Sequence, residues 1–275
     1  MTSGKRLGQH FLTDPQLLRR IADALDPAPA DVVIEIGPGR GSLTAELARR
    51  VARVIAIERD RKLAHDLRES GIGKRETGNV VVVEGDALKL DWHALVRSDT
   101  SPVSPFSFPG FKIIGNIPYA ITSPLIEKAL TPPLPERIVF LVQREVAERI
   151  AAAPGGKAYG ALSVGVQAAC SVELLFRVGA GAFRPPPKVE SALLRLTPLA
   201  EPLIAPADGP ALRRFVTACF GRRRKQLRNV LVAAAGRPAA EVNAGLAALG
   251  LDPAARPETL PPPAFVRLLR WSGRL

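Results

Sequence analysis

The sequence predicts an α/β protein, with a mostly parallel sheet covered by helices on both faces and a small helical domain at the C-terminus. Short runs of β-branched residues alternate with amphipathic segments through the first half of the chain, which is the order of strands and helices in a parallel sheet. A length of 275 residues is enough for one large core and a small second domain. These features indicate a globular α/β protein.

Five apolar runs are expected to form the central strands. They lie at residues 32–36, 54–57, 80–83, 113–114 and 138–142. Helical periodicity at 43–50 and 61–68 fills the first two intervals between them. Residues 97–111 are rich in Ser, Pro and Phe without periodicity, and we expect a mobile surface loop that borders the substrate entrance.

The C-terminal quarter has a different character. Prolines cluster at 202–210, and we place a domain boundary near Pro206, which divides the chain into residues 1–205 and 206–275. Residues 211–235 then read as one basic helix, in which Leu227 and Leu231 would face the core.

Net charge favours a polyanionic partner. The chain carries +12, and residues 201–275 hold twelve Lys and Arg against five Asp and Glu. Plain solubility is the simpler explanation of such an excess, but its concentration in one segment favours nucleic acid. The residues expected to contact RNA phosphates are Arg222, Arg223, Arg224, Lys225 and Arg228.

Cysteine and histidine usage predicts neither a disulfide framework nor a metal site. Cys170 and Cys219 are far apart among apolar residues, and the three histidines are scattered. We expect buried free thiols in a reducing compartment. Without a signal-like segment or a membrane-length apolar run, the sequence favours a cytoplasmic protein.

A glycine-rich turn follows the first strand. It reads Gly37-Pro38-Gly39-Arg40-Gly41, and Ser42 stands where a dinucleotide motif has its last glycine. This departure suits a nucleoside that has no pyrophosphate. Glu58 ends the second strand at the spacing of a ribose-binding acid, and Asp86 after the third could accept from an adenine amine.

The segment Gly115-Asn116-Ile117-Pro118-Tyr119 follows the fourth strand and is poorly suited to a core. The Asn116 side chain and the Ile117 carbonyl offer acceptors for the N–H groups of an exocyclic amine, and Pro118 stiffens the turn. Tyr119 offers a ring on which a base can stack. With the upstream nucleoside site, this segment predicts methyl transfer to adenine in RNA.

These motifs resemble the ribosomal RNA adenine dimethyltransferase family. Three further segments resemble it in the right order, at residues 8–12 (Gly-Gln-His-Phe-Leu), 183–191 (Phe-Arg-Pro-Pro-Pro-Lys-Val-Glu-Ser) and 220–229 (Phe-Gly-Arg-Arg-Arg-Lys-Gln-Leu-Arg-Asn). The nearest type is the small-subunit enzyme, which dimethylates two adjacent adenines near the 3′ end of 16S rRNA. His10 stands where the family more commonly has asparagine.

The resemblance implies S-adenosylmethionine as methyl donor, a class I methyltransferase sheet with one late antiparallel strand, and the pre-30S particle as partner. No metal is expected, and nothing in the sequence demands more than a monomer. Phe183 would stack on the target base opposite Tyr119. The residues that would contact the methyl donor are His10, Leu12, Gly37, Gly39, Glu58, Asp86 and Asn116.

Two alternatives remain open at this point. A large-subunit adenine methyltransferase of the resistance type shares the donor site and the Asn-Ile-Pro-Tyr motif. A non-catalytic assembly factor could keep the fold and bind RNA, although the intact motif at 116–119 favours catalysis. A mitochondrial transcription-factor relative is disfavoured because the N-terminus has no Arg/Ser-rich transit peptide.

Overall fold

The computed structural model describes residues 10–72, 78–97 and 110–273. The loop expected at 97–111 therefore lies almost entirely outside the described residues.

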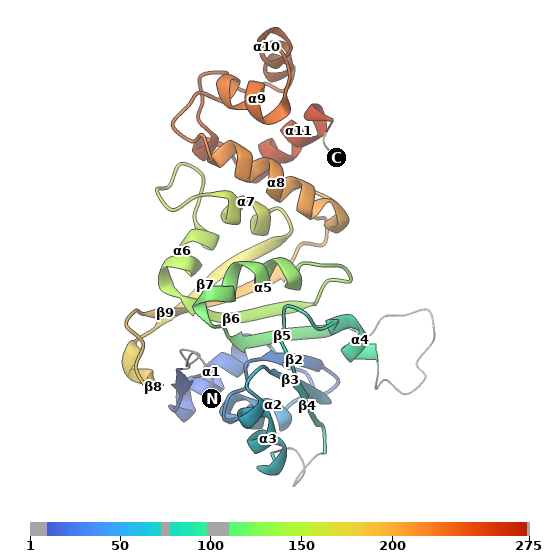
Figure 1. Cartoon of the computed structure of the whole chain (residues 1–275), viewed down its shortest axis with the longest axis vertical. Coiled ribbons are helices and arrows are strands. Elements are labelled where there is room, and N and C mark those ends of the chain that lie inside the picture. Colours follow the sequence, from blue (N-terminus) through green and yellow to red (C-terminus); the bar gives the residue numbers. More distant parts are fainter. Residues whose placement is uncertain (1–9, 73–77, 98–109, 274–275) are drawn as a thin grey trace, which may run out of the picture. The chain divides into compact units, whose positions relative to one another are not determined.

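Strands and helices alternate through most of the described chain (Figure 1). The strands are β1 (Phe11–Leu12), β2 (Val32–Ile36), β3 (Arg53–Glu58), β4 (Val80–Glu84), β5 (Phe111–Asn116), β6 (Arg137–Gln143), β7 (Cys170–Val178), β8 (Phe183–Arg184) and β9 (Ser191–Pro198). The α-helices are α1 (Pro15–Ala24), α2 (Ser42–Ala48), α3 (Arg61–Glu69), α4 (Trp92–Arg97), α5 (Thr122–Ala129), α6 (Arg144–Ala151), α7 (Ala161–Gln167), α8 (Gly209–Phe220), α9 (Leu227–Ala235), α10 (Ala239–Ala248) and α11 (Pro262–Ser272).

Within the described residues, seven strands form one sheet in the order β4-β3-β2-β5-β6-β9-β7. The pairs from β4 through β6 are parallel, and β9 runs antiparallel to β6. The five strands expected from the apolar runs are all present, and so is the late antiparallel strand. The strand order reverses between β2 and β5, so the carboxyl ends of these strands flank the crevice where open α/β sheets bind ligands.

The central strands of the sheet are buried on both faces, as expected of parallel strands between two layers of helices. Val33, Val54 and Ile114 share one cluster with buried residues of α1 and α2, while the alternate residues Ile34 and Ile113 are also fully buried. A local signal marks the start of α1. Asp14 caps α1 by accepting from two backbone N–H groups of its first turn.

Gly115 lies on β5 next to Ile36 of β2. A Cβ atom at this position would lie 2.6 Å from the backbone oxygen of Ile36 on the adjacent strand. A backbone oxygen held in a sheet cannot yield like a flexible side chain, so we expect Gly115→Ala to lower the free energy of unfolding by about 1–3 kcal/mol. Denaturant unfolding followed by circular dichroism measures this change.

The matched control for this prediction is Gly179→Ala. A Cβ atom at Gly179 would have no atom within 4 Å, and its φ of −69° suits any residue. We expect its unfolding free energy to stay within about 0.5 kcal/mol of the parent value. Equal stability of the two variants would contradict the proposed close contact.

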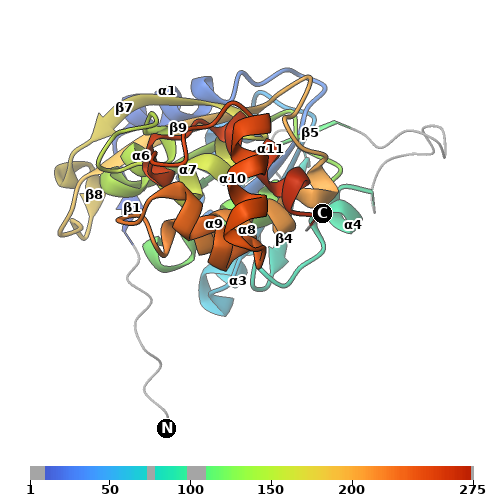
Figure 2. The same cartoon turned by 90° about the horizontal axis from the view of Figure 1, so that it is seen from above.

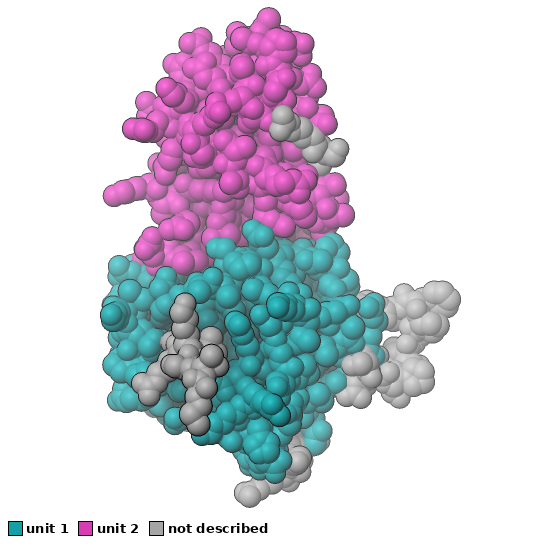
Figure 3. All heavy atoms as spheres, in the orientation of Figure 1, with its two compact units in different colours: residues 1–144, 173–197 teal, residues 145–172, 198–275 magenta. Residues whose placement is uncertain are grey.

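Two compact units divide the chain (Figure 3). Unit 1 comprises residues 1–144 and 173–197, and unit 2 comprises residues 145–172 and 198–275. Unit 2 has its own hydrophobic core, which includes Tyr159, Phe215 and Phe265. The helical unit is thus larger than the domain predicted from residue 206, because residues 145–172 and 198–205 pack into it as well.

The prediction of one basic helix over 211–235 is wrong. The chain forms α8 and α9, and residues 221–226 between them are a succession of turns (Figure 2). Gly221 ends α8, and Gln226 is extended at the start of α9. The backbone N–H of Leu227, the first of α9, donates a hydrogen bond to the carbonyl of Ala255 in a distant loop. In a continuous helix the same N–H would donate to the carbonyl four residues earlier in that helix.

The expected burial of two leucines and of both cysteines is confirmed. Leu227 and Leu231 are fully buried in the core of unit 2. Cys170 and Cys219 are buried free thiols, and burial raises the pKa of each to about 12. Among the described helices, none has the length and apolarity needed to cross a membrane.

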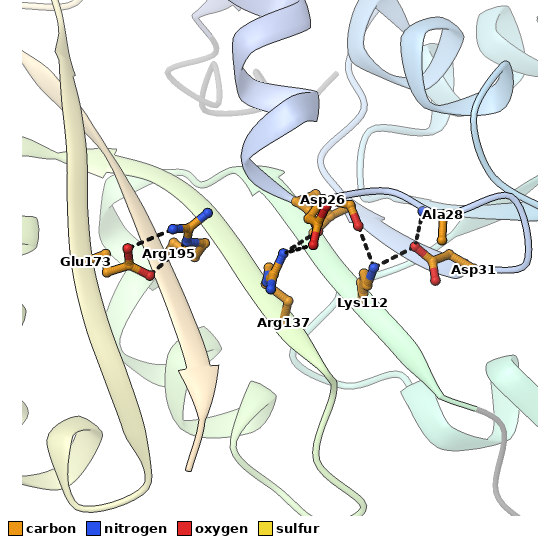
Figure 4. Close-up of polar contacts among 8 residues, drawn as sticks. Asp26, Ala28, Asp31, Lys112, Arg137, Glu173 and Arg195 are labelled. Carbon is orange, nitrogen blue, oxygen red and sulfur yellow. Dashed lines mark hydrogen bonds and ion pairs between the residues drawn. The ribbon is translucent and has the colours of Figure 1, made fainter. Parts of the chain in front are cut away.

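Ion pairs gather at the amino ends of β5 and β6, the edge of the sheet away from the glycine-rich turn (Figure 4). Lys112 and Arg137 are register partners on the two strands. Lys112 donates to Asp31 at 2.7 Å and to the carbonyl oxygen of Asp26 at 2.6 Å. Arg137 pairs with Asp26 at 2.8 Å and holds the pKa of that carboxyl below its usual value. These contacts fasten the loop between α1 and β2 to the central strands.

Candidate functional site

A cavity in unit 1 opens at the carboxyl ends of β2, β3 and β5. The space between the atoms that line it amounts to about 880 Å³ when the open mouth is included. The lining residues are His10, Phe11, Leu12, Leu18, Glu35, Gly37, Pro38, Gly39, Arg40, Ser42, Leu43, Glu58, Asn116, Ile117, Pro118, Tyr119 and Phe183. The structure therefore brings together most of the site residues expected from the sequence.

The glycine-rich turn forms one wall of this cavity. Gly37, Gly39 and Gly41 all have positive φ, a backbone conformation that side chains disfavour. The N–H of Gly37 donates to the carbonyl of Ile57 at 2.9 Å, which ties the turn to β3. A Cβ atom at Gly39 would lie 2.8 Å from the ring of Phe11, so only glycine fits beneath β1.

Glu58 lies at the end of β3 with only 5% of its surface exposed. One carboxylate oxygen accepts from the N–H of Gly39 at 3.0 Å, and the other accepts from the N–H of Asp60 at 2.9 Å. These bonds set the position of the glycine-rich turn and leave further lone pairs on both oxygens. The predicted ribose-binding acid thus faces the cavity.

Glu35 is a lining residue to which the sequence reasoning gave no role of its own. Its side chain is 1% exposed, and no group of the described residues bonds its Oε2 atom. Burial raises the pKa of this carboxyl to about 7, with the charge of Glu58 acting in the same direction and the Thr44 hydroxyl against it. The sequence feature that could have identified Glu35 is its position as the single acidic residue in the otherwise apolar strand at 32–36.

The raised pKa of Glu35 has a consequence for stability. The folded protein keeps the proton up to about pH 7, whereas the unfolded chain releases it near pH 4.5. The protonated Glu35 carboxyl makes its full contribution to the free energy of unfolding below pH 4.5. This contribution is lost as pH rises from 4.5 to 7, which lowers the free energy of unfolding by about 3 kcal/mol. We expect Glu35→Gln to remove this decline.

The measurement is urea unfolding of both proteins between pH 4.5 and 8. Other titrating groups are common to the two proteins, so the difference between the curves isolates Glu35. Parallel curves over this range would show that Glu35 is ionised in the folded protein.

Asn116 ends β5 with its amide held in one orientation. The Nδ2 atom lies 2.9 Å from the backbone oxygen of His10, and a carbonyl can only accept, so the NH₂ group faces that oxygen. The Oδ1 atom is the remaining acceptor of the amide. The next residue, Ile117, is buried, and its N–H donates to Leu141 at 3.0 Å, which continues the bonding between β5 and β6.

Tyr119 begins the short 3-10 turn Tyr119–Ile121, directly after Pro118. Its ring lines the cavity, and its hydroxyl lies 3.2 Å from that of Ser191, the first residue of β9. Ser191 is 1% exposed. A residue 72 positions along the chain therefore holds the tyrosine, and sequence reasoning assigned Ser191 no role of its own.

The short strands β1 and β8 pair antiparallel at the cavity. Leu12 is the register partner of Phe183, and both lie in the core of unit 1 as well as in the cavity lining. Phe183 is 1% exposed, so its ring packs in the core at the same time as it borders the cavity.

Not every predicted residue lies at this cavity. Asp86 is outside its lining, and its Oδ1 atom accepts from the N–H of Leu88 at 3.0 Å. The predicted RNA-contact residues belong to unit 2, where all of them are exposed: Arg222, Arg223, Arg224, Lys225 and Arg228. A search of the described residues finds no group of three or more His, Cys, Asp or Glu that could hold a metal ion.

Comparison with known structures agrees with the fold. A dimethyladenosine transferase from Plasmodium falciparum is 28% identical, with a TM-score of 0.80 over 96% of this chain and 98% of that chain. The 23S rRNA methyltransferase ErmE is 30% identical, with a TM-score of 0.71 over 96% of this chain and 99% of that chain. The predicted class I S-adenosylmethionine-dependent methyltransferase fold is confirmed.

Sequence comparison extends over nearly the whole chain. A model of the family described as ribosomal RNA adenine dimethylase matches residues 2–258. Proteins named ribosomal RNA small subunit methyltransferase A are 43% identical in Pseudomonas aeruginosa, over 98% of this chain and 95% of that protein, and 44% identical in Syntrophotalea carbinolica, over 96% and 94%. The chain belongs to the ribosomal RNA adenine dimethylase family.

Proposed function

We propose that this protein dimethylates the N6 atoms of two adjacent adenines near the 3′ end of 16S rRNA during assembly of the small subunit, with S-adenosylmethionine as methyl donor. One observation carries the proposal: Asn116 and Tyr119 lie in the same cavity as the glycine-rich turn and Glu58. The segment proposed to bind the target base and the residues proposed to bind the nucleoside of the donor thus line the same cavity. The names of the curated relatives, with over 40% identity, support the small subunit as substrate.

The cavity suits S-adenosylmethionine on its chemistry. This donor carries two cationic groups, a sulfonium and an ammonium, and the cavity contains the carboxyl group of Glu58. Glycines at 37 and 39 allow the backbone to approach a ligand closely. We propose that Gly37, Gly39, Glu58 and Leu12 hold the donor, with Asp86 as a further contact from the end of β4.

Asn116 has the central role in the proposed reaction. The amide NH₂ of Asn116 donates to the backbone carbonyl of His10, so its Oδ1 atom is free to accept a hydrogen bond from one N–H of adenine N6. The carbonyl of Ile117 accepts a hydrogen bond from the other N–H. Acceptors displaced from the base plane favour a tetrahedral amine, whose lone pair is then directed to the methyl group. S-Adenosylmethionine supplies that methyl group from its sulfonium.

Proton release completes each transfer. The bond from N6 to the methyl carbon forms as the bond from sulfur to that carbon breaks, which leaves a cationic amine. This ammonium is acidic and loses its proton to water. The second transfer has one N–H fewer to hold, so stacking on Tyr119 and against Phe183 keeps the base in place.

The exposed basic residues of unit 2 are proposed to bind rRNA phosphates. We expect joint replacement of Arg222, Arg223 and Arg224 by alanine to weaken RNA binding and to reduce the slope of log Kd against log salt by about three. Fluorescence anisotropy across a salt series measures this slope. Arg49→Ala, at an exposed position at the end of α2, is the control, and an equal effect there would contradict the assignment.

The test of function uses labelled S-adenosylmethionine and small ribosomal subunits that lack the modification. Two adjacent dimethylated adenines near the 3′ end are the expected result. Label in large-subunit rRNA would instead favour the second type of enzyme, to which ErmE belongs by name. Tight binding without transfer would indicate an assembly factor. Because the proposed substrate is the assembling small ribosomal subunit, we propose that the protein acts in the cytoplasm. We further propose that it acts as a monomer.

A further inference from the structure

A tight turn at residues 86–90 comes after β4 and begins with Asp86, the residue proposed to contact the donor from this strand. The Oδ1 atom of Asp86 accepts from the backbone N–H of Leu88 at 3.0 Å, so one carboxylate oxygen is used by the turn itself. The Oδ2 atom lies 4.0 Å from the guanidinium of Arg59, whose side chain is 61% exposed. The conformation of the turn therefore sets the direction in which the Asp86 carboxylate points.

Two side chains from outside the turn hold its carbonyl groups. The indole N–H of Trp92, in α4, donates to the carbonyl of Ala87 at 2.9 Å. The ammonium of Lys128, in α5, donates to the carbonyl of Leu88 at 3.2 Å. The same Nζ atom lies 5.3 Å from the centroid of the Trp92 ring, which is within the range of a cation–π interaction. Because Trp92 is only 4% exposed, its ring gives the ammonium a fixed surface beside the turn.

Lys128 reaches this turn from the helix that follows the segment proposed to bind the target base. Helix α5 starts directly after the 3-10 turn Tyr119–Ile121. Leu125 and Ile126 of this helix are fully buried, so the helix is anchored in the core of unit 1. The contact between Lys128 and the turn spans 40 residues of sequence. One short helix thus connects the turn after β4 to the segment that follows β5.

A lysine in the last turn of a helix commonly has a local role, in which its charge stabilises the terminal carbonyls of that helix. Lys128 occupies such a position in α5. The end of α5 is closed by the backbone N–H of Leu130, however, which donates to the carbonyls of Ile126 and Lys128. The Lys128 ammonium donates to Leu88, in a different element. This contact therefore concerns the turn after β4 more than the end of α5.

We propose that Lys128 is a positioning residue for the methyl donor, and that its ammonium holds the Leu88 carbonyl so that the Asp86 carboxylate is directed at the exocyclic amine of the donor's adenine. This inference rests on the proposed function and adds a residue on which recognition of the donor's base depends. A carboxylate can only accept a hydrogen bond, so the effect of Lys128 is specific to ligands that carry the amine.

Two nucleosides separate this role from a general effect on the site. S-Adenosylhomocysteine carries the adenine amine, whereas in S-inosylhomocysteine a carbonyl oxygen replaces it. Calorimetry with the full-length protein measures both affinities. We expect Lys128→Met, which keeps an unbranched side chain without the ammonium, to weaken binding of S-adenosylhomocysteine about three- to tenfold, the range of one hydrogen bond. Binding of S-inosylhomocysteine should change by less than about twofold, because its carbonyl oxygen has no proton to donate to Asp86.

Two further variants serve as controls. Lys128→Arg keeps a cation with N–H groups beside the Trp92 ring and should bind both nucleosides as the parent protein does. Lys89→Met removes the same charge from an exposed position in the same turn and should leave both affinities unchanged. The ratio of the two affinities does not depend on the fraction of folded protein, so a less stable variant still gives a result.

A double-mutant cycle with Asp86→Ala tests the proposed route of the effect. If Lys128 acts through the Asp86 carboxylate, Lys128→Met has no further effect on S-adenosylhomocysteine binding in the Asp86→Ala background. Additive effects of the two changes would overturn the positioning role. Equal losses of affinity for the two nucleosides in Lys128→Met would overturn it as well, because they would indicate a general structural role.

The outcomes distinguish the inference from the function on which it rests. If the parent protein binds S-adenosylhomocysteine and methylates small subunits but Lys128→Met binds this nucleoside equally well, the inference is overturned and the proposed function remains. If the parent protein binds neither nucleoside and transfers no methyl group, the proposed function itself is wrong.

Discussion

Replacement of Asn116 by alanine is expected to slow methyl transfer about 10²- to 10³-fold, because it removes an acceptor that acts on the reacting amine in the transition state. The amide is oriented by the His10 carbonyl at 2.9 Å, so the acceptor is already in place before the base binds. Such preorganised groups contribute more than mobile ones. The measurement is the single-turnover rate with labelled S-adenosylmethionine and under-methylated small subunits.

Asn116→Asp is the matched control for this prediction. Aspartate is isosteric and keeps an acceptor directed at the base, but it cannot donate to the His10 carbonyl. We therefore expect a rate between those of the parent protein and Asn116→Ala. The melting temperatures of both variants show whether the fold is intact. A parent-like rate for Asn116→Ala would exclude the proposed role of the amide oxygen.

Replacement of Lys112 by alanine is expected to lower the free energy of unfolding by up to about 3–5 kcal/mol, since it leaves the partly buried carboxylate of Asp31 without its cationic partner. Lys112 is 7% exposed and donates to Asp31 at 2.7 Å, as Figure 4 shows. The same ammonium also donates to the Asp26 carbonyl. The measurement is equilibrium unfolding in urea at neutral pH.

An exposed ion pair provides the comparison. Arg149 and Glu145 pair at 2.9 Å on α6, with side chains 46% and 81% exposed. Such pairs contribute about 0–1 kcal/mol, so Arg149→Ala should change stability little. If Lys112→Ala proved equally mild, water would be reaching Asp31 in the folded protein. The Lys112 pair lies at the opposite edge of the sheet from the cavity, so these effects concern stability.

The strands were predictable because their signal is local. A parallel strand buried on both faces reads as an unbroken apolar run, and each of the five runs lies in a strand whose ends extend at most two residues further. The helix expected at 61–68 is likewise α3, started by the capping side chain of Asp60. The prediction of one helix over 211–235 is wrong because the chain breaks between α8 and α9, where the N–H of Leu227 donates to the distant carbonyl of Ala255. No local sequence pattern reveals that contact.

The sequence alone was enough to assign the family and to predict several of the residues that line the cavity. The glycine-rich turn, Glu58 and the segment 115–119 each lie at the end of a strand, and strand ends of a parallel sheet meet at one edge. Their common location follows from the order of strands and helices, before any side-chain contact is known.

Only the tertiary structure decided how the side chains of the site are held. The His10 carbonyl that orients Asn116 is 106 residues away from it, and the Ser191 hydroxyl beside Tyr119 is 72 residues away. The same packing buries Glu35 and so raises its pKa. Sequence periodicity reports on local backbone geometry and burial, whereas these contacts depend on the closure of long loops, whose ends meet only when the sheet is complete.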